Sequence, residues 1–514
     1  APDILTVQTA TSVMGNYTFK LTFEQYSVIL VCMAFFFTFL RLHEVKVTEK
    51  RVFHIAGFIV VALGCGLFTN QIILSDFMEE HQINIRMFRP MESYQKYGGV
   101  LTFARSVGYA VVKKPEGYTT AKVDQIIQEY EKKSANEQQS TAKQYPNIIT
   151  VVNETFADIK VLGDFKTNED YMPYFHSLKK NCVTGYTYAS IVGGQTANTE
   201  FELLTGNTLG FLSAGTTAFQ LYIHGQMPSL VSNLKAEGYS GNKAMHPFNP
   251  YNYNRPAVYK DFGFTDFIDK FDFPKNVKRV REYISDEANV DRIISEYEKN
   301  RKKTDQPFYM YNMTIQNHSP YDKDAANFKQ PIKIESSKYD AEANRYLNLI
   351  KYSDDSLKQL TSYFEKCKEP TIILFLGDHQ PRLTDEFMNK ITNGQYQTWS
   401  SEQMMKRYQV PFVIWANYDI KEQHIEKTSM NYIQSILTKT AGVKMTGYQR
   451  FLNEVRKEVP TITSQGYWGK NGKFYQINDK GSPYYGIIQK YRMIQYNMMF
   501  DKKNRRDSFF EVSK

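Results

Sequence analysis

Four side chains with the chemistry of a metal-assisted phosphate site stand at the ends of apolar, strand-like segments. Glu154 ends the stretch "IITVVNE", His318 ends "YMYNMTIQNH", and Asp378 and His379 end "IILFLGDH". Because ligands collect at the carboxyl ends of parallel strands, these segments would bring carboxylates and imidazoles to one edge of a sheet. A mixed oxygen and nitrogen ligand set of this kind suits manganese, zinc or magnesium.

A hydroxyl group joins this set in the stretch "GGQTANTEFELLTG", which runs from Gly193 to Gly206. One interpretation makes Thr196 the N-cap of a helix, with its oxygen accepting a bond from a nearby backbone N–H. The other makes Thr196 a nucleophile, because the positive end of a helix is well placed to receive a phosphate. A divalent cation held there would lower the pKa of the hydroxyl and screen the charge of the phosphate.

Each of the remaining residues also has an ordinary structural role when it is considered alone. Glu154 could pair with a lysine, Asp378 could cap a following helix, and His318 could cap the turn before "SPY". Their shared placement at strand ends is hard to explain as separate coincidences. We therefore expect these side chains and Thr196 to lie together at one edge of the sheet.

The elements that must position these residues alternate along the second part of the chain. Several apolar segments are continuous and rich in β-branched or aromatic residues, as in strands that are buried on both faces of a parallel sheet. Stretches such as 342–366 are amphipathic and have the length of a crossover helix. The pattern predicts an α/β domain over residues 146–514, with a mostly parallel, doubly wound sheet flanked by helices.

Two apolar segments near the start of the chain, at about 21–40 and 52–74, predict transmembrane helices within a membrane portion that covers residues 1–75. The loop between them is basic, and the stretch "SDFMEEH" after the second is acidic. The positive-inside rule therefore places the loop in the cytoplasm and everything after Leu74 outside the cell. A buried core hairpin is the alternative. Since the sequence opens without a methionine, we take two helices as a lower bound.

Composition narrows the function further. The chain has 514 residues and a formal net charge of +9, but its basic residues are scattered and form no patch typical of nucleic-acid binding. The positive net charge favours a protein that acts near an anionic membrane or on a phosphate-bearing substrate. The four cysteines show no zinc or disulfide spacing, and pairing of Cys182 with Cys367 stays open. The pattern of residues 76–145 predicts a helical connector.

The domain resembles the lipoteichoic acid synthases, which are membrane phosphoglycerol transferases of the alkaline phosphatase and sulfatase superfamily. The resemblance covers residues 147–501 and rests on "NETF", "GGQTANTEFELLTG", "YNRPAVYKDFGFTDF", "NHSPY" and "GDHQP", which occur in the family's order. The family often has a tryptophan where Tyr253 stands, which indicates a different head-group pocket. The stretch "NCVTGYT" lacks the C/S-x-P-x-R pattern from which true sulfatases make formylglycine.

The resemblance implies a role for each of eight residues. Thr196 and His318 are implied as catalytic, Arg255, His246 and Tyr253 as substrate-binding, and Glu154, Thr196, Asp378 and His379 as holding a divalent metal, typically Mn²⁺, with Mg²⁺ or Zn²⁺ as alternatives. The planar guanidinium of Arg255 is suited to grip a phosphate through two parallel bonds. The imidazole of His318 would protonate the leaving oxygen or hold the phosphate.

The implied protein is a multi-pass enzyme of the cell membrane with an extracellular catalytic domain. It would move glycerol phosphate from phosphatidylglycerol to a growing polyglycerolphosphate chain of lipoteichoic acid, through a phosphothreonine-type intermediate. Alternatives are a primase acting on a glycolipid, a phosphodiesterase, and a phosphoethanolamine-type transferase, although the last usually carries several disulfides. A non-catalytic protein that binds teichoic acid is the remaining alternative, and a complete set of metal ligands and nucleophile argues against it.

Overall fold

The computed structural model describes residues 30, 33–34, 36–38, 51–74, 77–80, 90–109, 112–134, 144–335, 341–394 and 396–512. The chain divides into two compact units, Ala1–Val111 and Val112–Lys514. The boundaries at residues 75 and 145 that the sequence suggests stay predictions.

The first unit contains one long apolar helix. Helix α4 (Arg51–Phe68) continues into the π-helix η2 (Thr69–Leu74), and the short helices α5 (Phe77–Glu80), α6 (Pro90–Tyr97) and α7 (Gly99–Tyr109) follow. The span Ile55–Ile73 has a mean hydropathy of 1.8 and none of it is buried, so among the described residues it is the one helix long and apolar enough to cross a membrane. The other predicted membrane helix, at about 21–40, lies largely outside the described residues.

The second unit is built on an eight-stranded sheet. Its strands are β1 (Asn147–Asn153), β2 (Cys182–Tyr188), β3 (Ser240–Met245), β4 (Asp266–Ile268), β7 (Phe308–Met313), β8 (Thr371–Gly377), β9 (Gln409–Ala416) and β10 (Gln423–Ser429). They lie in the order β10-β2-β9-β8-β1-β7-β3-β4. Strand β9 is antiparallel to both of its neighbours, and every other pairing is parallel. The prediction of a mostly parallel sheet flanked by helices is confirmed.

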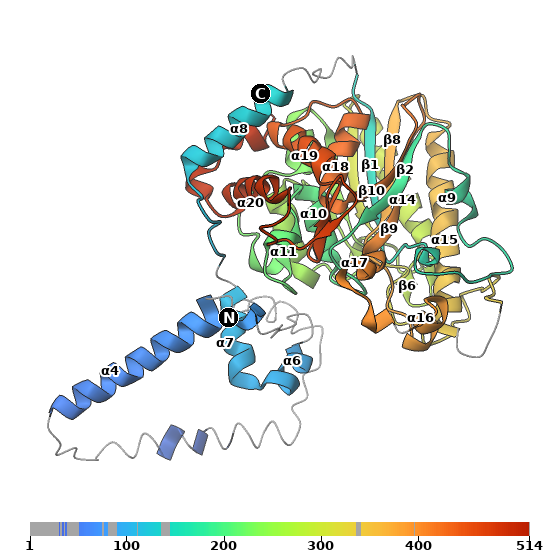
Figure 1. Cartoon of the computed structure of the whole chain (residues 1–514). Helices are drawn as coiled ribbons and strands as arrows, with labels where there is room; N and C mark the ends of the chain where they lie inside the picture. Colours follow the sequence, from blue (N-terminus) through green and yellow to red (C-terminus); the bar gives the residue numbers. More distant parts are fainter. Residues whose placement is uncertain are drawn as a thin grey trace. The chain divides into compact units, whose positions relative to one another are not determined.

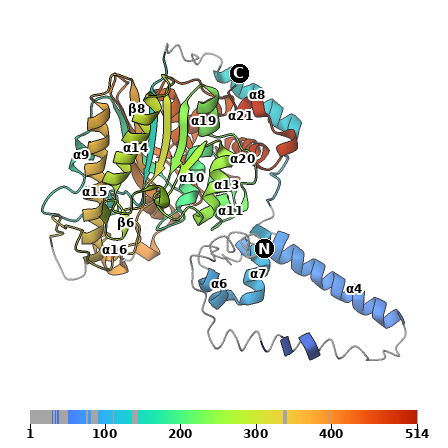
Figure 2. The ribbon, with the colours of Figure 1, turned by 180° about the vertical axis from the view of Figure 1, so that it is seen from behind.

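Apolar side chains on both faces of the sheet divide the interior into two cores. All seven residues of β1 are buried, and Ile148 and Val152 face one core while Ile149 and Val151 face the other. One core holds α8 (Thr120–Ser134), α10 (Thr196–Thr205), α11 (Ala218–Leu221), α12 (Leu230–Ala236), α13 (Arg255–Phe262), α18 (Met430–Thr440), α19 (Gly447–Glu458), α20 (Tyr485–Met499) and α21 (Asp507–Phe510). The other core holds α9 (Pro173–Ser177), α14 (Asp286–Arg301), α15 (Ala341–Phe364) and α16 (Asp385–Ile391). Figures 1 and 2 show these helices covering opposite faces of the sheet.

Smaller elements complete the second unit. They are the antiparallel sheet of β11 (Thr461–Thr463), β12 (Gly466–Trp468) and β13 (Phe474–Tyr475), the hairpin of β5 (Arg279–Val280) and β6 (Tyr283–Ile284), and the short helix α17 (Ser401–Met404). Helix α8, which the sequence places in a connector, packs into the core through Val123, Ile126 and Tyr130. The Tyr130 ring lies edge-on to Phe451 of α19, with 4.7 Å between the ring centroids.

Gly377 ends β8 where that strand passes the chain that leaves β1. A Cβ atom on Gly377 would lie 1.8 Å from the carbonyl oxygen of Phe156. A backbone atom cannot yield as the end of a flexible side chain can, so only glycine lets β8 approach β1 this closely. The close approach brings the residues that follow both strands together.

We therefore expect Gly377→Ala to lower the free energy of unfolding by roughly 2–4 kcal/mol, because the backbone must move apart at this point. Gly486, in the first turn of α20, has no atom within 4 Å of the place that a Cβ would take. Gly486→Ala should instead raise the stability by up to about 1 kcal/mol through helix propensity. Urea unfolding followed by circular dichroism measures both, and equal stability of the two variants would contradict this account of Gly377.

Candidate active site

Three neighbouring strands deliver the predicted chemical groups to the carboxyl edge of the sheet. Asn153 of β1 pairs in register with Gly377 of β8, so Glu154 and Asp378 leave the two strands side by side. His318 lies beyond the end of β7, five residues after Met313 rather than directly at the strand end, and the intervening chain makes a turn. Because β8, β1 and β7 are neighbours in the sheet, the residues that follow them lie at one edge, as expected.

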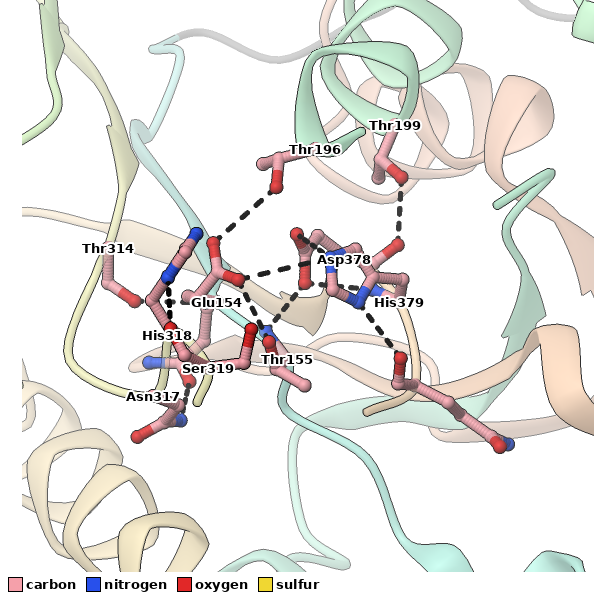
Figure 3. A network of polar contacts seen from close by, with 12 residues as sticks. Glu154, Thr155, Thr196, Thr199, Thr314, Asn317, His318, Ser319, Asp378 and His379 are labelled. Atoms are coloured by element: carbon pink, nitrogen blue, oxygen red, sulfur yellow. Dashed lines mark hydrogen bonds and ion pairs between the residues drawn. The ribbon is translucent and has the colours of Figure 1, made fainter. Parts of the chain in front are cut away.

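Glu154, Asp378 and His379 form a buried cluster whose ligand atoms all lie within 4.8 Å of one another. The Nε2 atom of His379 is 3.3 Å from Oδ2 of Asp378 and 3.9 Å from Oε1 of Glu154. All three residues are at most 3% exposed. Figure 3 shows the three side chains converging between the strand ends.

The hydrogen bond of His379 indicates which ring nitrogen faces the cluster. Its Nδ1 atom lies 3.0 Å from the carbonyl oxygen of Gln380, and since a carbonyl can only accept, Nδ1 carries the proton. The Nε2 atom therefore faces the carboxylate oxygens, and both Nε2 and Oδ2 of Asp378 are buried without a hydrogen-bond partner. Buried oxygen and nitrogen atoms that face one another in this way are stabilised by a cation between them. The donor set of two carboxylates and one imidazole fits Mn²⁺, Zn²⁺ or Mg²⁺.

The electrostatics of the cluster agree with a cation site. Burial, together with the negative charge of Asp378, raises the pKa of the Glu154 carboxyl to about 8. The charge of a divalent cation bound at this point would outweigh both effects and keep the carboxyl ionised.

Thr196 is the first residue of α10 and points its hydroxyl into the cluster. The N-cap position belongs to Gln195, which has a φ of 67° and makes no side-chain cap bond. The Thr196 hydroxyl instead donates to Oε2 of Glu154 over 3.5 Å (Figure 3). The interpretation of Thr196 as an N-cap is therefore wrong. The preceding turn is tied to the site as well, since the Gly193 amide donates to the carbonyl of Gln380 over 3.0 Å.

Three further threonines, which the sequence did not single out, hold the cluster in place. The Thr155 amide donates to Oδ1 of Asp378 over 2.6 Å, and its hydroxyl donates to Oε1 of Glu154 over 2.9 Å. Thr155 has a φ of 54°, a conformation rare for a β-branched residue. Thr199 donates to the Asp378 carbonyl, and Thr314 accepts from the Glu154 amide. The motif "NETF" contains Thr155, but its contacts depend on the backbone turn, which composition does not reveal.

Asp378 and Glu154 do not play the ordinary structural roles that are common at strand ends. Asp378 is not a helix cap, because the next helix, α16, begins only at Asp385 and is capped by Thr384. Within the part of the chain that the structure describes, Glu154 forms no ion pair with a lysine. The two cysteines whose pairing the sequence left open, Cys182 and Cys367, are both free thiols.

His318 and His246 are both held with a proton on Nδ1. The Nδ1 atom of His318 lies 2.7 Å from the Ser319 carbonyl, and that of His246 lies 2.9 Å from the Met313 carbonyl. Burial lowers the pKa of His318, while burial and the charge of Arg255 hold the pKa of His246 well below its usual value. Both imidazoles are therefore neutral acceptors at Nε2 in the resting protein.

Arg255 begins α13 and is buried against α10. Its Nε and Nη2 atoms donate to Oε1 of Glu200 over 3.0 and 2.7 Å, and the Tyr259 hydroxyl bonds to the same carboxylate. Burial alone would lower the pKa of Arg255, but the charge of Glu200 outweighs it and raises the pKa. The guanidinium lies over the Tyr253 ring, 5.1 Å from its centroid. Glu200 takes the donors on the Nε and Nη2 edge of the guanidinium, which carries further N–H donors at its Nη1 and Nη2 end.

A model of the sulfatase family matches residues 146–443, which is more than half of the chain. The chain belongs to the sulfatase family. Its relatives include the lipoteichoic acid synthase of Staphylococcus saprophyticus, with 23% identity over 374 residues, 70% of this chain and 55% of that protein. The resemblance to the lipoteichoic acid synthases within the alkaline phosphatase and sulfatase superfamily is confirmed.

A second relative and a solved structure extend the comparison. A putative cyclic beta-1,2-glucan modification protein of Rhizobium meliloti is 30% identical over 433 residues, 83% of this chain and 65% of that protein. The chain thus spans less than two thirds of the length of these relatives. The Streptococcus pyogenes phosphoglycerol transferase GacH in complex with sn-glycerol-1-phosphate shares the fold, with a TM-score of 0.63 at 20% identity, covering 78% of this chain and 100% of that one.

The cation site predicts an unusual response to Asp378→Asn. The new amide would donate to the Nε2 lone pair of His379, so the metal-free variant should be at least as stable as the wild type. It should lose the stabilisation by Mn²⁺, which in the wild type reaches about 2.7 kcal/mol at a hundredfold excess over Kd. Thermal unfolding with EDTA and with Mn²⁺ measures both effects.

The matched control is Asp354→Asn. Asp354 is also buried, but it accepts from the backbone amides of Tyr174 and Phe175 and has no place in the cluster. This variant should keep the full response to Mn²⁺. If Asp378→Asn keeps the full stabilisation by Mn²⁺, the cation does not bind at this cluster.

Proposed function

We propose that this protein is a metal-dependent phosphoglycerol transferase that moves glycerol phosphate from phosphatidylglycerol to an acceptor hydroxyl. The observation that carries the proposal is the Thr196 hydroxyl, which is directed at Glu154 beside a buried set of two carboxylates and one imidazole. A protein that only binds a polymer has no use for a buried nucleophile beside unpaired metal ligands. The family membership and the shared fold with GacH support the same reaction class.

In the first half of the proposed reaction, the Thr196 oxygen attacks phosphorus and the bond from phosphorus to the diacylglycerol oxygen breaks. Thr196 gives up one proton and the leaving oxygen gains one, so diacylglycerol departs and a threonine glycerophosphate diester remains. A bound divalent cation would supply charge stabilisation and a lowered hydroxyl pKa. The free Nη1 and Nη2 end of Arg255 binds phosphate oxygens, with His246 and Tyr253 shaping the head-group pocket.

In the second half, the acceptor hydroxyl attacks the phosphorus of the threonine diester, and the Thr196 oxygen leaves and regains a proton. His318 is suited to take the proton of the acceptor, because burial lowers its pKa and leaves Nε2 as a neutral base. The sequence left two roles open for His318, which were to protonate the first leaving oxygen or to hold the phosphate. A neutral resting imidazole fits the second step better.

Two classes of acceptor are candidates for this reaction. The resemblance to the lipoteichoic acid synthases implies a growing polyglycerolphosphate chain as acceptor, and the relative from Staphylococcus saprophyticus supports it. A glycan is the second candidate, which the relative named for cyclic beta-1,2-glucan modification favours. In both cases we place the second unit outside the cell, with Ile55–Ile73 crossing the membrane, as the charge pattern predicts.

Thr196→Ala should abolish transfer while leaving the fold in place, because Thr196 caps no helix. Mn²⁺ binding should weaken without being lost, because the variant keeps Glu154, Asp378 and His379 and lacks only the hydroxyl ligand. The more conservative Thr196→Ser should keep part of the activity. Intact-mass analysis of wild-type protein given phosphatidylglycerol and Mn²⁺ without acceptor should show one glycerophosphate adduct on the peptide that contains Thr196. Release of diacylglycerol by Thr196→Ala at the wild-type rate would exclude Thr196 as the nucleophile.

Arg255→Lys should raise the KM for phosphatidylglycerol at least tenfold, since one ammonium cannot bond Glu200 and a phosphate together as the guanidinium fork does. Mn²⁺ affinity should stay unchanged, because Arg255 donates no ligand. Initial rates across donor concentrations and a metal titration of the same samples give both values. An unchanged KM would place the phosphate away from Arg255.

A further inference from the structure

Two large apolar side chains of the second unit are strongly exposed among its described residues, and both flank the same edge of the sheet. Tyr251 is 44% exposed and Phe271 is 71% exposed. Tyr251 follows β3 and Phe271 follows β4, so both stand on loops that leave the carboxyl ends of the outer strands. Every other large apolar residue described in this unit is at least half-buried. Exposed rings confined to the functional edge point to a ligand.

The strand order gives an estimate of the distance between the strand ends that carry these rings and those that carry the cation cluster. Strands β1, β7, β3 and β4 are consecutive in the sheet. At about 4.8 Å between neighbours, the end of β4 lies roughly 14 Å from the end of β1. The cation cluster occupies the ends of β8 and β1, and His318 follows β7. The loops that leave β3 and β4 therefore lie within roughly 14 Å of the cluster, beside His318.

The side chains over these strand ends form a continuous row that starts at His318. The Phe248 ring stacks on the His318 imidazole, with 6.3 Å between centroids and an interplanar angle of 21°. The Lys270 Nζ atom lies over both Phe248 and Phe271, at 5.9 and 4.9 Å from the ring centroids. The two loops are tied together, since the Lys270 amide donates to the Phe248 carbonyl over 3.4 Å. An acceptor whose hydroxyl reaches His318 extends along this row.

We propose that Phe248, Lys270 and Phe271 form an acceptor subsite for a neutral sugar residue. The proposal rests on the transferase function above and names the class of its acceptor. Sugar rings present C–H groups that pack on aromatic faces and hydroxyls that pair with charged groups.

The charges of the loop decide between a neutral and an anionic acceptor. The turn that carries Phe271 is formed by Asp269, Lys270 and Asp272, with two carboxylates for one ammonium. Asp269 accepts from the Phe271 amide and Asp272 from the Asp269 amide, which fixes both carboxylates on the turn. The two carboxylates of this turn disfavour a polyanion such as polyglycerolphosphate, whereas the hydroxyls of a sugar can donate to them.

Binding to the full-length protein tests the subsite without relying on catalysis. The probes are cyclic β-1,2-glucan, poly(glycerol phosphate) and phosphatidylglycerol vesicles, with affinity measured by titration calorimetry for the polymers and by flotation for the vesicles. Phe271→Ala should weaken glucan binding roughly tenfold, while Phe271→Tyr restores it because the ring is kept. Tyr485→Ala, on the surface of α20, is the control and should bind as the wild type.

Unchanged glucan affinity in Phe271→Ala would overturn the subsite, as would a loss that affects poly(glycerol phosphate) or vesicle binding instead. The transfer reaction separates this inference from the proposed function. In Phe271→Ala the single burst of diacylglycerol released without acceptor should equal that of the wild type, while the KM for glucan rises roughly tenfold. If the wild type releases no burst of diacylglycerol, the proposed transferase function is wrong. The glucan titration would still test the subsite.

Discussion

The rest of the structure depends on the close burial of two carboxylates and an imidazole at the end of the sheet. Two carboxylates and an imidazole lone pair converge within 4.8 Å, at positions that water barely reaches. Burial and mutual repulsion make this arrangement costly, as the raised pKa of Glu154 shows. A divalent cation converts the same arrangement into a favourable one. The site is therefore best understood as a cation site whose protein ligands are held in place before the ion arrives.

The surrounding fold supplies that rigidity through backbone geometry. The close approach of β8 to the chain after β1 requires Gly377, and the left-handed turn at Thr155 aims one amide and one hydroxyl at two different ligands. Thr199 links α10 to the Asp378 carbonyl. Because the strained and close-packed residues surround the cluster, its geometry is set by the sheet rather than by mobile side chains.

The sequence predicted the parts of this arrangement that follow from periodicity and strand ends. Continuous apolar runs identified the buried strands, and the residues that end them identified Glu154, Asp378 and His379. The path of the chain between elements was less predictable. Gln195, not Thr196, occupies the N-cap position of α10. Strand β7 ends five residues before His318. The reversed direction of β9 and the core packing of α8 depend on contacts distant in sequence, which no local pattern encodes.

The most direct test of this account is diffraction from crystals of the protein grown with Mn²⁺, recorded on both sides of the manganese absorption edge. The account predicts one strong anomalous peak between Glu154, Asp378 and His379, within about 2.3 Å of an oxygen or nitrogen of each and of the Thr196 hydroxyl oxygen. A cluster without a peak at saturating Mn²⁺, or a peak with the Thr196 hydroxyl turned away, would contradict it.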